Sequence, residues 1–204
     1  MKDINKSFKI LKSMSKYSIK KVFIVSFVCT IVAFGGIYLC RGNENDIELP
    51  ENYNEKVEAV TQYIKYAITN QNYKYEDLKL SPETLVLESI KHNFDLPFMM
   101  AQAHQESCFG MSPRARKTNS VFAVGSYDDG SNKHIYETQD ESISTYINLL
   151  KSNYLVNGKS ELDLLKTNGF VDYNNNRYAS DENYEITIKY LRNKIIKMHP
   201  VLAN

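Results

Sequence analysis

Stretches in which apolar residues recur every three or four positions alternate along the chain with shorter polar stretches. This spacing places the apolar side chains on one face of a helix, so it predicts amphipathic helices. The first example is residues 54–69, where Val57, Val60, Ile64 and Ile68 share a face. Further predicted helices cover residues 82–93, 96–110 and 160–166, and two more carry the apolar positions of 143–150 and 184–195. The pattern therefore predicts a mainly α domain.

Polar residues mark where several of these helices begin. Ser81-Pro82 provides a cap and a first-turn proline, and Thr138 with Glu141 three residues later fits a capping box. Ser180 or Asp181 is expected to cap the last helix. The polar residues 70–79 are expected to form a loop. Residues 114–117, with Arg114, Arg116 and Lys117, are also expected on a loop, as a solvated surface or facing a polyanionic cell wall.

One region has the pattern of a small β-hairpin. The runs 121–127 and 132–136 flank Asp128-Asp129-Gly130-Ser131, and Asp-Gly between two such runs is a hairpin signal. The expected fold class is therefore mainly α (α+β), a helical domain with a small β-hairpin lobe.

The N-terminal part differs from the rest in charge and hydropathy. Residues 1–21 carry seven Lys and one Asp, a net charge of +6, whereas residues 22–40 are 19 residues without a charge. A run of this length suits one transmembrane helix, and the preceding lysines are expected to keep the N-terminus cytoplasmic. The sequence thus predicts a basic cytoplasmic segment at 1–21, an anchor at 22–40, a linker at 41–53 and an extracytoplasmic domain at 54–204. Secretion after signal cleavage is the alternative, because Ala33-Phe34-Gly35 is a passable cleavage site.

Several function classes are disfavoured. Residues 41–204 carry 18 basic and 23 acidic residues, a net charge of −5, which gives no support for binding nucleic acid. The three cysteines form no disulfide framework, and Cys108 is expected to be a small buried hydrophobe. The four histidines lack metal-ligand spacing, and no nucleophile elbow or phosphate-binding loop is present. We therefore expect no metal and no cofactor.

The strongest chemical candidate is Glu106, near the end of the apolar helix predicted for 96–110. Helical spacing places Met99, Gln102 and Ala103 on its face. Burial among such neighbours would raise the pKa of the carboxyl group and keep it protonated near neutral pH, as a general acid requires. The alternative is an ordinary glutamate in solvent at a helix end.

A resemblance to a known family adds to this interpretation. Residues 101–110 read Ala-Gln-Ala-His-Gln-Glu-Ser-Cys-Phe-Gly, and Asn-Ser-Val-Phe follows at 119–122. This resembles the bacterial glucosaminidase family of peptidoglycan hydrolases, the lysozyme-like group of flagellar muramidases and many autolysins. The family reads AQA, two variable residues, E-S, a small residue and W-G, then Asn-Asn-Leu-Phe-Gly. Cys108, Phe109 and Ala123 depart from that pattern in detail.

Two further patches follow in the same order. Tyr136, Ser142-Ile143 and Tyr146 have the family's Tyr, Ser-Ile, Tyr spacing, and residues 178–184 resemble its Tyr-Ala-Thr-Asp-Pro-Asn-Tyr segment. The resemblance covers roughly residues 82–196. It also implies a small β-lobe beside the cleft, where the sequence has its hairpin signal.

The resemblance implies roles for individual residues. Glu106 falls on the catalytic acid, Asp129 is the candidate second carboxylate, and Tyr178 matches a cleft tyrosine that would orient an N-acetyl group or stabilise the transition state. Gln102, Phe109 and Asp128 are expected to bind substrate. Each has a plainer alternative: turn chemistry for the two aspartates, packing for Tyr178 and surface for Gln102. An N-acetylated substrate can also supply its own nucleophile, so that no second carboxylate is needed.

The expected activity is hydrolysis of β-1,4 bonds in peptidoglycan glycan strands by an endo-β-N-acetylglucosaminidase without a cofactor. The nearest enzyme alternatives are a muramidase and a lytic transglycosylase, which also uses one glutamate but leaves an anhydro sugar end. The alternative from another class is a non-catalytic wall-binding or structural protein that keeps the fold.

Overall fold

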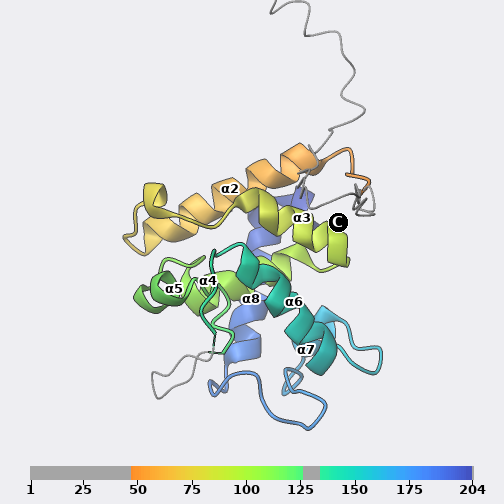
Figure 1. The fold of residues 1–204 in the computed structure, drawn as a ribbon. Helices are drawn as coiled ribbons and strands as arrows, with labels where there is room; N and C mark the ends of the chain where they lie inside the picture. The colour runs from red at the N-terminus through yellow and green to blue at the C-terminus, as the bar shows by residue number, and fades with distance from the viewer. Residues whose placement is uncertain (1–46, 126–133, 204) are drawn as a thin grey trace, which may run out of the picture. The chain divides into compact units, whose positions relative to one another are not determined.

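The computed structural model describes residues 47–125 and 134–203, which belong to one compact unit spanning residues 46–204 (Figure 1). The predicted basic segment and the predicted anchor at 22–40 lie outside the described residues. Among the residues that are described, no helix combines the length and the apolar character needed to cross a membrane.

Helices make up the described part of the chain. They are α2 (Tyr53–Asn70), η1 (Tyr75–Asp77), α3 (Pro82–His92), α4 (Leu96–Ser107), α5 (Pro113–Thr118), α6 (Glu141–Asn153), α7 (Glu161–Leu164), α8 (Tyr184–Met198) and η2 (Pro200–Ala203). The described residues contain no strand, only one isolated antiparallel bridge between Val171 and Arg177. The prediction of a mainly α domain is confirmed.

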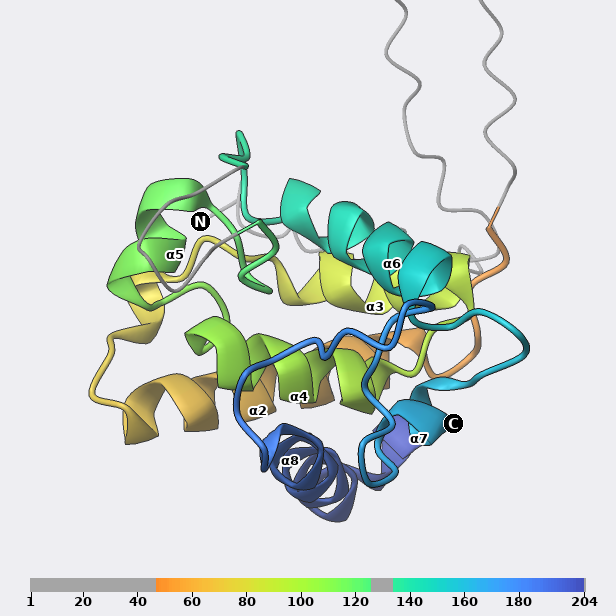
Figure 2. The ribbon, with the colours of Figure 1, turned by 90° about the horizontal axis from the view of Figure 1, so that it is seen from below.

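Helix α4 lies in the middle of the domain, with α3 and α6 on one side and α8 on another (Figures 1 and 2). Every residue from Leu96 to Ala103 is buried, so this helix is apolar all round, as expected for a helix enclosed by others. Helix α4 packs more extensively against α8 than against any other described helix. Helix α2 covers the same core with the predicted stripe, of which Val60, Ile64 and Ile68 are fully buried.

The helix starts follow local capping chemistry. The Ser81 hydroxyl accepts a hydrogen bond from the Thr84 N–H at 3.3 Å, and the Asp95 carboxylate accepts one from the Phe98 N–H at 2.7 Å. Each helix has a proline in its first turn. At α6 the Thr138 hydroxyl accepts from the Glu141 N–H at 3.2 Å, but the Glu141 carboxylate accepts from the Glu137 N–H at 2.9 Å, so the predicted capping box is formed only in part.

Two helix predictions need correction. Residues 114–117, expected on a loop, lie in α5 (Pro113–Thr118), because Ser112 accepts a hydrogen bond from the Ala115 N–H at 3.3 Å and Pro113 occupies the first turn. Neither Ser180 nor Asp181 caps α8, which begins at Tyr184 after Asn183 without a side-chain cap. The Asp181 side chain instead accepts from the Asn183 N–H at 2.9 Å in the preceding turn.

The predicted hairpin has no strand in its described parts, residues 121–125 and 134–136. Val121 and Phe122 are buried in the helical core instead, where the Phe122 ring stacks on Tyr146 at 3.8 Å between centroids. Ala123 and Gly125 have φ angles of 53° and 71°, which interrupt an extended backbone. The turn of the predicted hairpin lies outside the described residues.

Helix α4 ends three residues earlier than predicted. Cys108, Phe109 and Gly110 all have left-handed φ angles, of 50°, 58° and 83°. The Phe109 N–H donates to the Ala103 carbonyl at 2.9 Å, and the Cys108 N–H donates to the His104 carbonyl at 2.9 Å. These bonds satisfy the last carbonyl groups of the helix. The result is that Glu106 lies in the last turn of α4.

Candidate active site

The Glu106 carboxyl group is partly buried at the end of α4 and accepts a short hydrogen bond from the Tyr184 hydroxyl of α8. Burial raises the pKa of Glu106 from its ordinary value of 4.5 to about 7, although the hydrogen bond from Tyr184 acts in the opposite direction. The partial negative charge at a helix C-terminus also favours the protonated form. Near neutral pH the group is therefore divided between acid and carboxylate, which suits a general acid.

Behind Glu106 lies a chain of hydrogen bonds that connects three helices. The Tyr146 hydroxyl of α6 donates to the Gln102 side-chain oxygen in α4. The Gln102 amide nitrogen donates to the Tyr184 hydroxyl at 2.9 Å, and that hydroxyl donates to Glu106. All three supporting side chains are buried. Each side chain in this chain thus donates to the next, and the last donor, Tyr184, holds the Glu106 carboxyl group.

Tyr178 also lies close to the acid. Burial and, next, the charge of Glu106 raise the pKa of Tyr178 well above its ordinary value. The ring stacks on Phe170 at 4.5 Å between centroids, and the hydroxyl donates to the Phe122 carbonyl over a long 3.4 Å. The ring is therefore fixed, and the hydroxyl, which is also hydrogen-bonded with Gln102, lies near Glu106.

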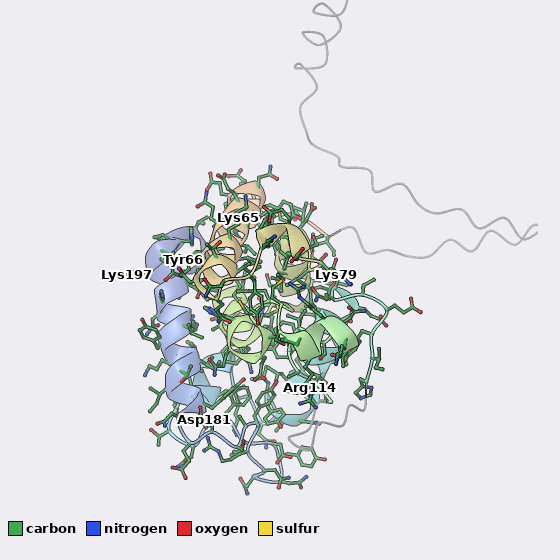
Figure 3. The ribbon with its side chains drawn as sticks, turned by 90° about the vertical axis from the view of Figure 1, so that its left-hand side faces the viewer. Lys65, Tyr66, Lys79, Arg114, Asp181 and Lys197 are labelled. Carbon is green, nitrogen blue, oxygen red and sulfur yellow. The ribbon has the colours of Figure 1, made fainter. Side chains whose placement is uncertain are left out.

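Glu106 borders a small hollow of about 20 Å³, roughly the room for one water molecule. The hollow is lined by Glu106, Ser107, Ser112, Arg114, Ala115, Thr118, Ser120 and Ala123. Within the described part of the chain, Glu106 is the one carboxylate in this lining. Figure 3 shows Arg114 and Asp181 in the lower half of the domain, whereas Lys65 lies at its upper end.

The turn after Glu106 is held by the side chains of Ser107 and Gln139. The Ser107 hydroxyl accepts from the Gly110 N–H at 2.7 Å and donates to the Val121 carbonyl at 2.5 Å. The Gln139 amide donates to the Gly110 carbonyl at 2.9 Å, and a Cβ at Gly110 would lie 2.5 Å from that amide nitrogen. These contacts fix the segment that borders the hollow.

The predicted site residues have different outcomes. Glu106 and Tyr178 lie together, whereas Asp128 and Asp129 lie outside the described residues. Gln102 and Phe109 were expected to contact substrate, but both side chains are fully buried. The Gln102 amide is used on both sides within the protein, and the Phe109 ring packs against Tyr63 and His104 in the core. Neither position fits direct contact with a ligand.

Two members of the site, Tyr146 and Tyr184, were predicted from the sequence as core residues and as parts of the family-like segments, but not as site residues. A buried tyrosine hydroxyl needs a hydrogen-bond partner, and this was the available signal that they do more than fill space.

Other reactive groups are not arranged for catalysis. Burial raises the pKa of the Cys108 thiol to about 11, which keeps it protonated and unreactive. No cluster of three His, Cys, Asp or Glu side chains suited to a metal ion occurs in residues 47–125 and 134–203. His104 is hydrogen-bonded to the Tyr63 hydroxyl at 3.0 Å on another face of α4.

Comparison with known proteins gives no assignment: no protein-family model matches the chain, and no curated protein matches it.

Proposed function

We propose that this protein is a peptidoglycan hydrolase that cleaves β-1,4 bonds of the glycan strand, with Glu106 as the general acid. The observation that carries the proposal is a carboxyl group at the edge of a surface hollow, with its pKa raised to about 7 by burial and with its position fixed by Tyr184. Proton donation to a leaving glycosidic oxygen requires a carboxylic acid that is still protonated at working pH.

The family resemblance gains physical support from the backbone. Two departures from the family pattern, Cys108 at its small residue and Ala123 at its glycine, have φ angles of 50° and 53°. Of the two, only the family's glycine suits a positive φ without steric cost, because a Cβ of any size is disfavoured there. At position 123 the backbone therefore has the shape that the family's residue would favour, even where this sequence differs.

In the mechanism that we propose, a glycan strand lies across the surface beside Glu106 and the hollow that it borders. Glu106 protonates the oxygen of the leaving sugar. The Tyr178 hydroxyl, which donates to the Phe122 carbonyl over 3.4 Å and is hydrogen-bonded with Gln102, turns toward the substrate and donates to its N-acetyl group or to the transition state. A two-carboxylate mechanism also needs a second carboxylate, as the nucleophile of a retaining enzyme or the base of an inverting one. Asp129 remains our candidate for it.

A one-carboxylate mechanism is the second candidate, because no other carboxylate of the described residues lines the hollow. The N-acetyl oxygen of the substrate would then attack the anomeric carbon, and water would open the resulting ring. A lytic transglycosylase would instead use a sugar hydroxyl of the substrate as the nucleophile and leave an anhydro end.

The products decide among these reactions. Purified peptidoglycan is digested with the full chain in mild detergent, and the products are reduced with borohydride and analysed by mass spectrometry. We expect reduced N-acetylglucosamine ends. Reduced N-acetylmuramic acid ends would make the protein a muramidase, and anhydro ends a transglycosylase.

A Glu106→Gln variant separates an enzyme from a wall-binding protein. We expect the variant to pellet with peptidoglycan as the wild type does but to release no fragments. Unchanged lysis by this variant would refute the role of Glu106. Pelleting by both proteins without release by either would favour the non-catalytic alternative.

For localisation, we propose a single-pass membrane protein with residues 22–40 as the anchor and the hydrolase domain outside the cell. The charge of +6 in residues 1–21 and the uncharged run that follows support this orientation. Protease added to intact protoplasts should remove residues 54–204 and leave a small N-terminal fragment. A full-length chain that is protected from the protease would contradict this orientation.

A further inference from the structure

Gln102 occupies an unusual place for an amide side chain. It is fully buried at the centre of the domain, one helical turn before Glu106, and it is linked to the acid through the Tyr184 hydroxyl. Gln102 is also hydrogen-bonded with Tyr178. A buried amide in an otherwise apolar helix costs free energy unless both of its ends are satisfied. Here the oxygen accepts from Tyr146 and the nitrogen donates to Tyr184, so both ends are used.

The direction of each hydrogen bond follows from the one before it. The Tyr146 hydroxyl donates, so the oxygen end of the Gln102 amide faces α6 and the NH₂ end faces α8. An NH₂ group can only donate, and therefore the Tyr184 hydroxyl must act as its acceptor. The one proton of that hydroxyl is left for Glu106. Tyr146 thus determines the direction of a bond two side chains away.

We propose that Gln102 and Tyr146 are positioning residues for the acid, and that their hydrogen bonds keep the Tyr184 hydroxyl donating to the Glu106 carboxyl group. Only the catalytic consequence of this role rests on the proposed function. The hydrogen bonds themselves exist whether or not the protein cuts a glycan.

The titratable groups that face Glu106 come from four segments. Tyr146 of α6, Tyr178 of the segment before α8, and Tyr184 of α8 all lie within electrostatic range of its carboxylate. Arg114 of α5 lines the same hollow. Of these groups, only the Tyr184 hydroxyl is hydrogen-bonded to the Glu106 carboxyl group in the described structure.

Loss of the chain has a defined effect on the acid. Tyr184→Phe removes the hydrogen bond that stabilises the carboxylate, so the pKa of Glu106 should rise by about one unit, as is typical for one bond to a charged group. Tyr146→Phe leaves the Gln102 amide free to turn its oxygen toward Tyr184. The Tyr184 proton is then shared between two acceptors, and the pKa of Glu106 should rise by a smaller amount, about half a unit.

The test reads the proton on Glu106 directly and needs no substrate. The full chain is labelled with glutamate that carries ¹³C at the side-chain carboxyl group, and the Glu106 signal is assigned by its loss in Glu106→Gln. Its chemical shift is then followed from pH 4 to pH 9 in the wild type, Tyr184→Phe and Tyr146→Phe.

Tyr63→Phe is the matched control. Tyr63 of α2 is also a fully buried tyrosine. Its hydroxyl is hydrogen-bonded to His104 of α4, outside the chain that leads to Glu106. We expect no change in the Glu106 titration for this variant. The double variant Gln102→Met/Tyr146→Phe removes both partners of one bond, so it leaves no unpaired group there and tests the chain if Tyr146→Phe alone disturbs folding. It also removes the amide that donates to the Tyr184 hydroxyl and polarises it toward Glu106, so we expect a small upward shift of the Glu106 titration.

Upward shifts for Tyr184→Phe and Tyr146→Phe, with none for Tyr63→Phe, would support the positioning role. A shift for Tyr184→Phe alone, with none for Tyr146→Phe or the double variant, would overturn it, as would no shift for any variant. Failure of the proposed function has a different signature. In that case the titrations shift as expected, but no variant or wild type releases glycan fragments.

Discussion

Replacement of the proposed catalytic acid should make the protein more stable, and the gain should depend on pH. Glu106 is partly buried, and its ionised form has lost part of its hydration. Glutamine at this position keeps the shape and can still accept the Tyr184 hydrogen bond, but it carries no charge. We therefore expect Glu106→Gln to unfold at a higher urea concentration than the wild type at pH 8 and at a similar concentration at pH 4.

The magnitude follows from the pKa of Glu106, which burial raises from 4.5 to about 7 in the folded protein. Below pH 4.5 Glu106 is protonated in both the folded and the unfolded chain, so the free energy of unfolding has its full value. Between pH 4.5 and 7 the unfolded chain loses its proton first, so the free energy of unfolding falls as the pH rises. Above pH 7 the loss is complete and reaches at most about 3 kcal/mol, which the glutamine variant should not incur.

Urea denaturation of residues 46–204, followed by circular dichroism, measures this difference at both pH values. Glu182→Gln is the matched control, because Glu182 is exposed in the turn before α8. Its effect should be small and the same at pH 4 and pH 8. If the gain from Glu106→Gln were the same at both pH values, the stabilisation would not come from the charge, and the raised pKa would be refuted.

Three further outcomes are expected from the structure. Hydrolysis, measured as kcat/KM on soluble glycan fragments, should fall about tenfold per pH unit above pH 7, because Glu106 loses the proton that it donates. Ala123→Gly should raise the free energy of unfolding by about 1 kcal/mol, seen as a higher Tm, because Ala123 has a φ of 53°. Arg177→Ala should cost about 3 kcal/mol in urea denaturation, because it leaves the buried Glu185 carboxylate without its partner at 2.9 Å; a loss under 1 kcal/mol would contradict a buried ion pair.

The helices of the core could be predicted from sequence because each depends on local information. The apolar spacing of residues 54–69 and the Ser81-Pro82 start lead directly to α2 and α3. Helix α5 was predictable by the same rule, since Ser112-Pro113 repeats the Ser-Pro start, but its cationic residues suggested a loop. The end of α4 was not, because three successive left-handed residues there include Cys108 and Phe109, which rarely adopt that conformation.

The site is a different case, because its parts meet only in the tertiary structure. Glu106 could be proposed from its own helix and from the motif around it. Tyr184 lies 78 residues further along the chain, and its role depends on how α8 packs on α4. Periodicity identified both Gln102 and Tyr184, but it placed one on a possible surface and the other in the core. A pattern of apolar positions says which side chains are buried and not which polar atoms meet inside.

The protonation of Glu106 is therefore a property of the packing between two helices rather than of one residue. Burial raises the pKa of Glu106, and the Tyr184 hydrogen bond lowers it. The value of about 7 results from both, and both arise where α8 lies against α4. The same contact is held at the other end of α4 by Arg192 of α8, paired with Asp95 at 2.6 Å. A change that loosens the packing of α8 on α4 at Tyr184 should therefore shift the pKa of Glu106, because it weakens the hydrogen bond and the burial that set it.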